Sequence, residues 1–135
     1  LLWRKPAAAP AAPVLSPWDA AMKRLRDLND RQLAERGKHE QFYVDLSSIL
    51  RFYIEDRYHV HAPEQTTPEF LESAARTGFF SEEHQLLLAG FLRHADRVKF
   101  ARLEPSLEEM RDSFEAVQRY VRETVPRAEP AEAAA

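Results

Sequence analysis

Apolar side chains recur along this chain every three or four residues, the spacing that places them on one face of an α-helix. The pattern is clearest over residues 42–58, where the main stripe consists of Phe42, Leu46, Ile49, Leu50 and Tyr53. Tyr43, Ile54 and Tyr58 lie beside that stripe and widen the apolar face. A face this wide predicts a central, well-buried helix.

Local start and stop signals predict helices on either side of this segment. Ser16, followed by Pro17, begins a helix that we expect to run to Gly37, because serine caps free backbone N–H groups and proline suits the first helical turn. After the central helix, the proline at residue 63 forces a corner. The segment Thr67-Pro68-Glu69 then predicts a new helix with the Thr67 hydroxyl as its cap, ending at Gly78.

Two more helices follow from serines that precede acidic residues. Ser81 predicts a helix that reaches Ala95 or beyond, and Ser106 predicts a last helix that Pro126 closes. Gly90 lies inside the fourth helix, where a glycine destabilises, so we interpret it as a point of close contact between helices.

These signals predict an all-α fold, a single compact bundle of about five helices. The sequence also leaves open an alternative arrangement in which the helices stack as hairpins. No segment alternates apolar and polar residues as a strand would. The expected division is a basic, Pro/Ala-rich linker at residues 1–16, a helical domain at 17–125 and a disordered tail at 126–135.

Charge and composition argue against several classes of site and function. The 135 residues contain no cysteine, so disulfides and thiolate metal sites are excluded. The net charge is −3, yet residues 1–38 hold eight Lys or Arg against four acids, while residues 39–135 hold eleven against eighteen. An acidic main body argues against a nucleic-acid-binding domain, because such domains need exposed cations for phosphates.

The first residues indicate an anchor. Leu1-Leu2-Trp3 is followed by Arg4-Lys5 and then by a run rich in proline and alanine. Tryptophan favours the headgroup level of a membrane, and basic residues favour its cytoplasmic side. We therefore expect a transmembrane helix preceding Leu1, with this domain on the cytoplasmic side of the membrane.

Few residues offer catalytic chemistry. His59, His61 and Glu64 are the nearest approach to a metal motif and carry the alternative of a metal-dependent hydrolase, although a site needs more ligands. Glu82, Glu83 and His84 lie in the first turn of a predicted helix, where acids stabilise the helix dipole. Ser47-Ser48 follows no nucleophile elbow. No glycine-rich loop is present to bind a phosphate, so we expect no cofactor and no enzyme activity.

The corner near residue 63 carries the remaining polar candidates. Arg51, Glu69 and Lys99 each lie beside apolar runs, and we expect some of them to form a buried or half-buried pairing that fixes the corner. Tyr53, Thr67 and Pro68 complete this set of structural corner residues.

The run Phe42-Tyr43 to Tyr58, then Ala62-Pro63-Glu64-Gln65-Thr66-Thr67-Pro68-Glu69-Phe70, then Asp96-Arg97-Val98-Lys99-Phe100-Ala101, resembles the cytoplasmic C-terminal domain of BatD-like bacterial proteins. It is also similar to short single-span bacterial membrane proteins of unknown function. The likeness covers roughly residues 18–125. The Thr-Pro-Glu motif also occurs in cytoplasmic domains near transglutaminase-like membrane proteins.

The resemblance implies a membrane-anchored accessory protein linked to MoxR-type AAA ATPases and to proteins with von Willebrand factor A domains. It supplies no catalytic residues. The function expected from the sequence is therefore a non-catalytic interaction module with protein partners, with a hydrolase or a helical nucleic-acid-binding domain as alternatives.

Overall fold

A computed structural model describes residues 14–126 of the chain. These residues form five α-helices and one short 3-10 helix: α1 (Pro17–Asp30), α2 (His39–Tyr58), η1 (Ala62–Glu64), α3 (Thr67–Thr77), α4 (Glu82–Phe100) and α5 (Leu107–Glu123). The described residues contain no strand. The all-α prediction with five helices is confirmed. The predicted linker and tail lie largely outside the described residues.

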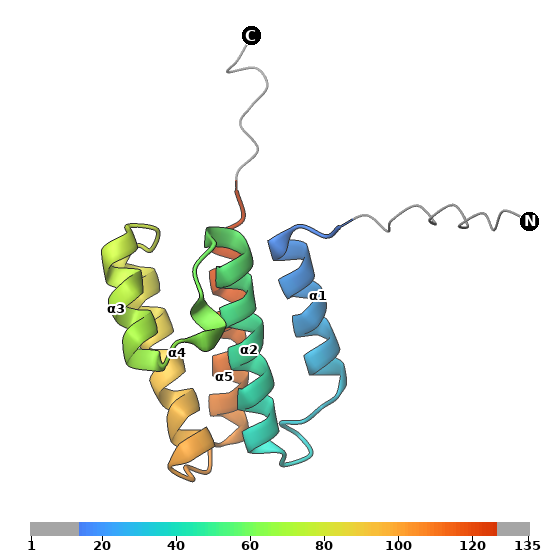
Figure 1. The fold of residues 1–135 in the computed structure, drawn as a ribbon. Helices are drawn as coiled ribbons and strands as arrows, with labels where there is room; N and C mark the ends of the chain where they lie inside the picture. The colour runs from blue at the N-terminus through green and yellow to red at the C-terminus, as the bar shows by residue number, and fades with distance from the viewer. Residues whose placement is uncertain (1–13, 127–135) are drawn as a thin grey trace, which may run out of the picture.

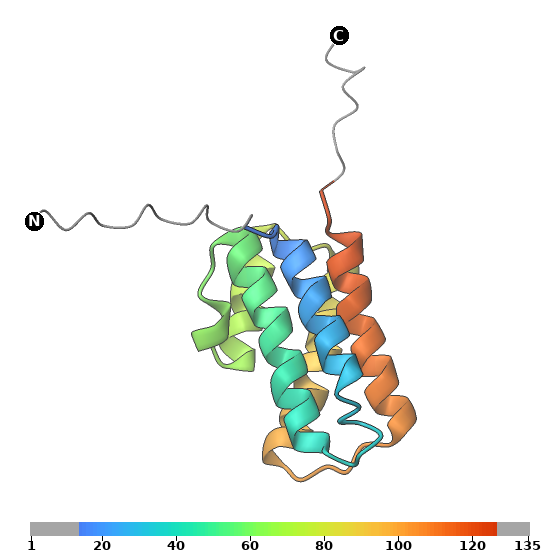
Figure 2. The same cartoon turned by 90° about the vertical axis from the view of Figure 1, so that its right-hand side faces the viewer.

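Four of the helices close into a ring. α1 packs against α2 and α5, α2 also packs against α4, and α4 packs against α5, so each helix touches two neighbours around the ring. Consecutive helices of the ring run in opposite directions, and α3 lies outside it against α4 (Figures 1 and 2). The arrangement is therefore a closed four-helix bundle with an added helix, and the contact of α1 with α5 distinguishes it from a linear stack of hairpins.

The bundle has two distinct ends. α1 begins and α5 ends at one end, while the connections α1–α2 and α4–α5 lie at the other (Figure 1). We call the second the distal end. No helix in the range 14–126 is both long enough and apolar enough to cross a membrane.

The central position predicted for α2 is confirmed. Nine of its residues are buried, and Tyr43, Leu46 and Leu50 are fully enclosed. The α2 side chains face α1 on one side and α4 and α5 on the other. Contact with three helices explains why its apolar face is so wide in the sequence, although Val44 and Phe52 stay exposed.

Side-chain caps begin four of the five α-helices. The hydroxyls of Ser16, Ser81 and Ser106 each accept a hydrogen bond from the backbone N–H three residues later, as predicted. The cap of α3 is Thr66 rather than Thr67, because the Thr66 hydroxyl accepts from the Glu69 N–H at 3.3 Å. The prediction of Thr67 as the cap was wrong by one residue.

Two other local predictions were wrong. α1 ends at Asp30 rather than at Gly37, because Gln32 takes a left-handed conformation (φ 52°) that an α-helix cannot continue. Gly90 does not mark a close helix contact, since a side-chain carbon at this position would meet nothing within 4 Å. It lies on the exposed side of α4.

Candidate functional site

The corner between α2 and α3 is fixed by one buried guanidinium. Arg51 is 8% exposed, and it donates to the carbonyl oxygens of Ala62 (2.9 Å) and Gln65 (2.6 Å) and to the Thr67 hydroxyl (3.1 Å). Its guanidinium carbon also lies 5.6 Å from the centre of the Phe70 ring. Arg51 thus acts as a buried partner for the Gln65 carbonyl and as a second partner for the Ala62 carbonyl, which also accepts the Gln65 N–H.

The structure separates Arg51 from the other charged residues named for this corner. Glu69 is exposed and accepts a hydrogen bond from the Thr66 hydroxyl at 2.8 Å. Lys99 lies 3.7 Å from Asp96, one turn back on α4. Among the three, only Arg51 is buried, and its partners are two carbonyls and a hydroxyl rather than a carboxylate.

Tyr53 and Pro68 also lie apart from the Arg51 network. The Tyr53 hydroxyl is 2.6 Å from that of Thr124, at the end of α5. It also accepts from Arg57 at 3.2 Å. Pro68 is exposed in the first turn of α3. Tyr53 therefore ties α2 to α5, while Pro68 supports the start of α3.

Burial sets the ionisation of both cations near the corner. Burial lowers the pKa of Arg51, and the nearby carboxylate of Asp96 partly offsets this shift. Burial likewise lowers the pKa of Lys99, with Asp96 again opposing the change. The hydrogen bonds of the buried Arg51 therefore serve as a structural joint of the corner.

The histidines considered for metal binding do not gather a ligand set. His59 ends α2 in a left-handed conformation (φ 58°) and is exposed, as are His61 and Glu64. Within residues 14–126 no group of three His, Asp or Glu side chains is placed to hold a metal ion.

Glu83 and His84 form structural contacts between the start of α4 and the end of α5. The His84 Nε2 lies 3.0 Å from a Glu123 carboxylate oxygen, and Arg119 bridges Glu123 (3.2 Å) and Glu83. Hydrogen bonds from His84 and Arg119 lower the pKa of Glu123. Every one of these groups is occupied by a partner across the helix pair.

The remaining residues considered for catalysis are equally unsuited. Ser47 is 2% exposed and its hydroxyl is buried, so it cannot reach a substrate from solution. Ser48 is half-buried on the same helix, and Glu82 is exposed in the first turn of α4.

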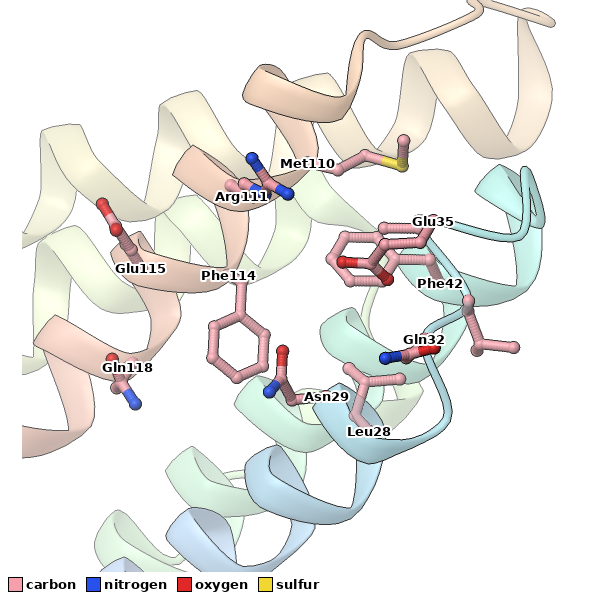
Figure 3. Close-up of a pocket in the computed structure, with 12 residues that line it drawn as sticks. Leu28, Asn29, Gln32, Glu35, Phe42, Met110, Arg111, Phe114, Glu115 and Gln118 are labelled. Carbon is pink, nitrogen blue, oxygen red and sulfur yellow. The ribbon is translucent and has the colours of Figure 1, made fainter.

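An open apolar pocket lies between α1, α5 and the start of α2, toward the distal end. It encloses about 260 Å³. Its apolar lining consists of Leu28, Leu33, Ala34, Phe42, Met110 and Phe114. In Figure 3, Phe114 reaches from α5 toward Asn29 on α1. We call this cavity the α1–α5 pocket.

The early end of α1 creates this pocket. Beyond Asp30 the chain turns away, and residues 31–37 form turns instead of two further helical turns against α5. Leu33 folds back and is buried (6% exposed), which anchors the connection. The side of Phe114 on α5 therefore stays half-exposed instead of being covered by α1.

The rim of the α1–α5 pocket is polar and carries both signs of charge. It consists of Asn29, Gln32, Glu35, Arg111, Glu115 and Gln118. An apolar floor with a polar rim is the usual composition of a site that receives one apolar group. Its volume is below the range typical of drug-sized ligands, which starts at about 300 Å³. It exceeds the roughly 150 Å³ that holds a benzene ring.

Sequence reasoning missed this pocket because its opening depends on where α1 ends. The only signal was Gln32, at which polar character interrupts the apolar spacing between Leu28 and Leu33. Comparison of the sequence and the structure with protein-family models, curated proteins and solved structures gave no match.

Proposed function

We propose that this protein is a non-catalytic interaction module that binds a partner protein by taking one of its bulky apolar side chains into the α1–α5 pocket. The observation that carries this proposal is the open, apolar pocket of about 260 Å³ with a polar rim. Such a pocket suits an anchor residue of an interface, since anchor residues fill well-packed pockets.

The arrangement of the other polar side chains supports a binding role over a reaction. Arg51, His84 and Glu123 are each committed to contacts inside the domain. None of them lines the α1–α5 pocket. The pocket itself presents amides, two glutamates and one arginine, a set that can orient a partner but holds no nucleophile next to a base.

The partner class and location rest on the resemblance alone. We propose a MoxR-type AAA ATPase or a von Willebrand factor A-domain protein as the partner. We also propose attachment through a transmembrane helix preceding Leu1, which would hold the domain at the cytoplasmic face of a bacterial inner membrane.

A pocket-filling variant tests this function. Ala34→Trp would occupy the α1–α5 pocket, and Ala75→Trp, at an exposed position of α3, is the matched control. Calorimetric titration of the chain with a MoxR-type ATPase and with an A-domain protein of the same organism should show binding by at least one. Ala34→Trp should weaken it about tenfold or more, because losing an anchor costs roughly 1.4 kcal/mol or more.

Two results would contradict the proposal. Equal binding by Ala34→Trp and Ala75→Trp would place the interface elsewhere. No binding by the intact chain to either protein would reject the proposed partners.

A further inference from the structure

A second, larger groove opens at the distal end, on the other side of the start of α2. It lies between the first turn of α2, the end of α4 and the α4–α5 connection, and encloses roughly 900 Å³. Its apolar lining includes Val44, Phe100 and Leu103, which are 39%, 78% and 40% exposed. We call it the distal groove. Three partly exposed apolar side chains therefore lie together along this groove.

The charges around the distal groove differ from those of the rest of the domain. Three cations line it, Lys38, Lys99 and Arg102, against the two carboxylates of Glu40 and Glu104. From residue 39 onward the chain as a whole has eighteen acids and eleven Lys or Arg. The groove lining thus holds one more cation than carboxylates, on a body in which acids outnumber cations. Lys99 also lies 5.3 Å from the ring centre of Phe100, so charge and apolar surface are adjacent.

The start of α2 adds to the positive character of this groove. Its cap position, Lys38, makes no capping hydrogen bond with its side chain, whereas α1, α3, α4 and α5 are each capped by a hydroxyl. The first N–H groups of a helix carry partial positive charge. Lys38 adds a full charge at the same place.

Arg102 occupies a backbone position that usually belongs to glycine. Its φ is 56°, and the Leu103 N–H reaches back to the Arg97 carbonyl at 3.1 Å, which closes the end of α4. A left-handed residue other than glycine costs roughly 1 kcal/mol. The chain therefore holds a cation at the edge of the groove despite a conformational cost.

We infer that the distal groove binds an acidic segment of a partner protein. An apolar side chain of that segment would lie on Phe100, Leu103 and Val44. Its carboxylates would face Lys38, Lys99 and Arg102. The apolar surface favours a peptide over a nucleic acid, whose phosphates gain nothing from Phe100. The inference does not rest on the α1–α5 pocket, which shares no residue with this groove.

Fluorescence anisotropy with a short labelled peptide tests the inference. The probe carries glutamates around a central phenylalanine, and its counterpart carries lysines in place of the glutamates. The acidic probe should bind the chain, and binding should weaken as salt is added, since surface charges are screened. The lysine counterpart should not bind.

Arg102→Gly separates binding from stability. It removes a cation and also relieves the left-handed strain, so the variant should melt at the same or a higher temperature while binding the acidic probe about two- to fivefold more weakly. His59→Gly is the matched control, because it relieves a similar strain (φ 58°) outside both the distal groove and the α1–α5 pocket and should leave probe binding unchanged. Phe100→Ser should also weaken binding.

The inference is overturned if the intact chain does not bind the acidic probe, or if it binds the lysine counterpart equally well. Unchanged binding in both Arg102→Gly and Phe100→Ser would place the probe elsewhere. Displacement of the probe by a generic DNA duplex at low concentration would identify the surface as a nucleic-acid site instead.

Discussion

The eight residues between α1 and α2 and the eight between α2 and α3 lie at opposite ends of the same helix and are held in different ways. The second connection folds around Arg51, whose guanidinium bonds to two of its carbonyls. The first connection relies on backbone bonds within residues 32–38, on the buried side chain of Leu33 and on an ion pair of Arg31 with Asp45.

The two connections therefore differ in what they leave open to solvent. The connection built around Arg51 has two of its carbonyls bound to that guanidinium inside the fold. The Gln65 side-chain oxygen is nevertheless buried without a partner among the described residues, and His59, Val60 and His61 line a pocket where the connection begins. The connection built around Leu33 leaves the side of α5 uncovered and opens the α1–α5 pocket. The clearest pattern in the sequence predicts the corner between α2 and α3. The α1–α5 pocket arises at the α1–α2 connection, where the sequence carries no clear signal.

The largest expected effect is at the corner between α2 and α3. Arg51→Met should lower the free energy of unfolding by about 3 kcal/mol, because the carbonyls of Ala62 and Gln65 and the Thr67 hydroxyl would lose their buried partner. Urea denaturation measures the change. Arg93→Met, at an exposed position of α4, is the control and should have little effect. A loss below about 1 kcal/mol for Arg51→Met would show that water replaces the guanidinium.

A smaller loss is expected at the open connection. Leu33→Ala should cost about 2 kcal/mol, the low end for a buried leucine, because the site borders a pocket and can relax. Leu86→Ala, at a position 76% exposed, should change stability by less than about 0.5 kcal/mol. Equal effects of the two substitutions would mean that Leu33 does not anchor the connection.

Glycine at the left-handed positions should stabilise both connections alike. Gln32→Gly and His59→Gly relieve φ angles of 52° and 58°. Each should raise the free energy of unfolding by about 0.5 kcal/mol, since the added freedom of the unfolded chain cancels part of the gain. Thermal unfolding followed by circular dichroism can resolve the shift. Destabilisation by either glycine would mean that the replaced side chain contributes more than its backbone strain costs.

The smallest effect is expected at Lys99. Burial lowers its pKa, so its charge is disfavoured in the folded state, and its partner Asp96 is 3.7 Å away and partly exposed. Lys99→Met should therefore stay within about 0.5 kcal/mol of the wild type in urea denaturation. A loss as large as that of Arg51→Met would show that the two cations fix the corner together.

The fold was predictable from the sequence where the determining interactions are local. Ser16, Ser81 and Ser106 start their helices by bonding to N–H groups three residues ahead, and each signal lies within one helical turn. The central place of α2 was also predictable, because contact with several neighbouring helices shows directly in the width of its apolar face.

The predicted helix ends were wrong where two neighbouring residues give the same signal, or where the packing of other parts of the chain decides the outcome. Thr66 and Thr67 can both cap α3, and it is contact with Arg51 across the corner that commits Thr67 to another role. Gly37 was the expected end of the first helix, yet α1 already ends at Asp30. The chain turns there because Gln32 is left-handed, and glutamine is a residue type with no strong signal for stopping a helix.

Neither surface proposed for binding could be read from the sequence. The α1–α5 pocket joins residues from α1, α2 and α5, and the distal groove joins the start of α2 to the end of α4. Spacing along the chain predicts which face of a helix is apolar, but the gap between faces depends on how far each neighbouring helix extends.

The position of the first and last helical residues has a mechanical consequence. Because α1 begins and α5 ends at the same end of the bundle (Figures 1 and 2), tension between these two helix ends pulls α1 and α5 apart sideways. The contacts between these helices then break one turn at a time from that end, instead of all sliding together. The domain should open under a low pulling force, and the distal surfaces should be the last part of the ring to separate.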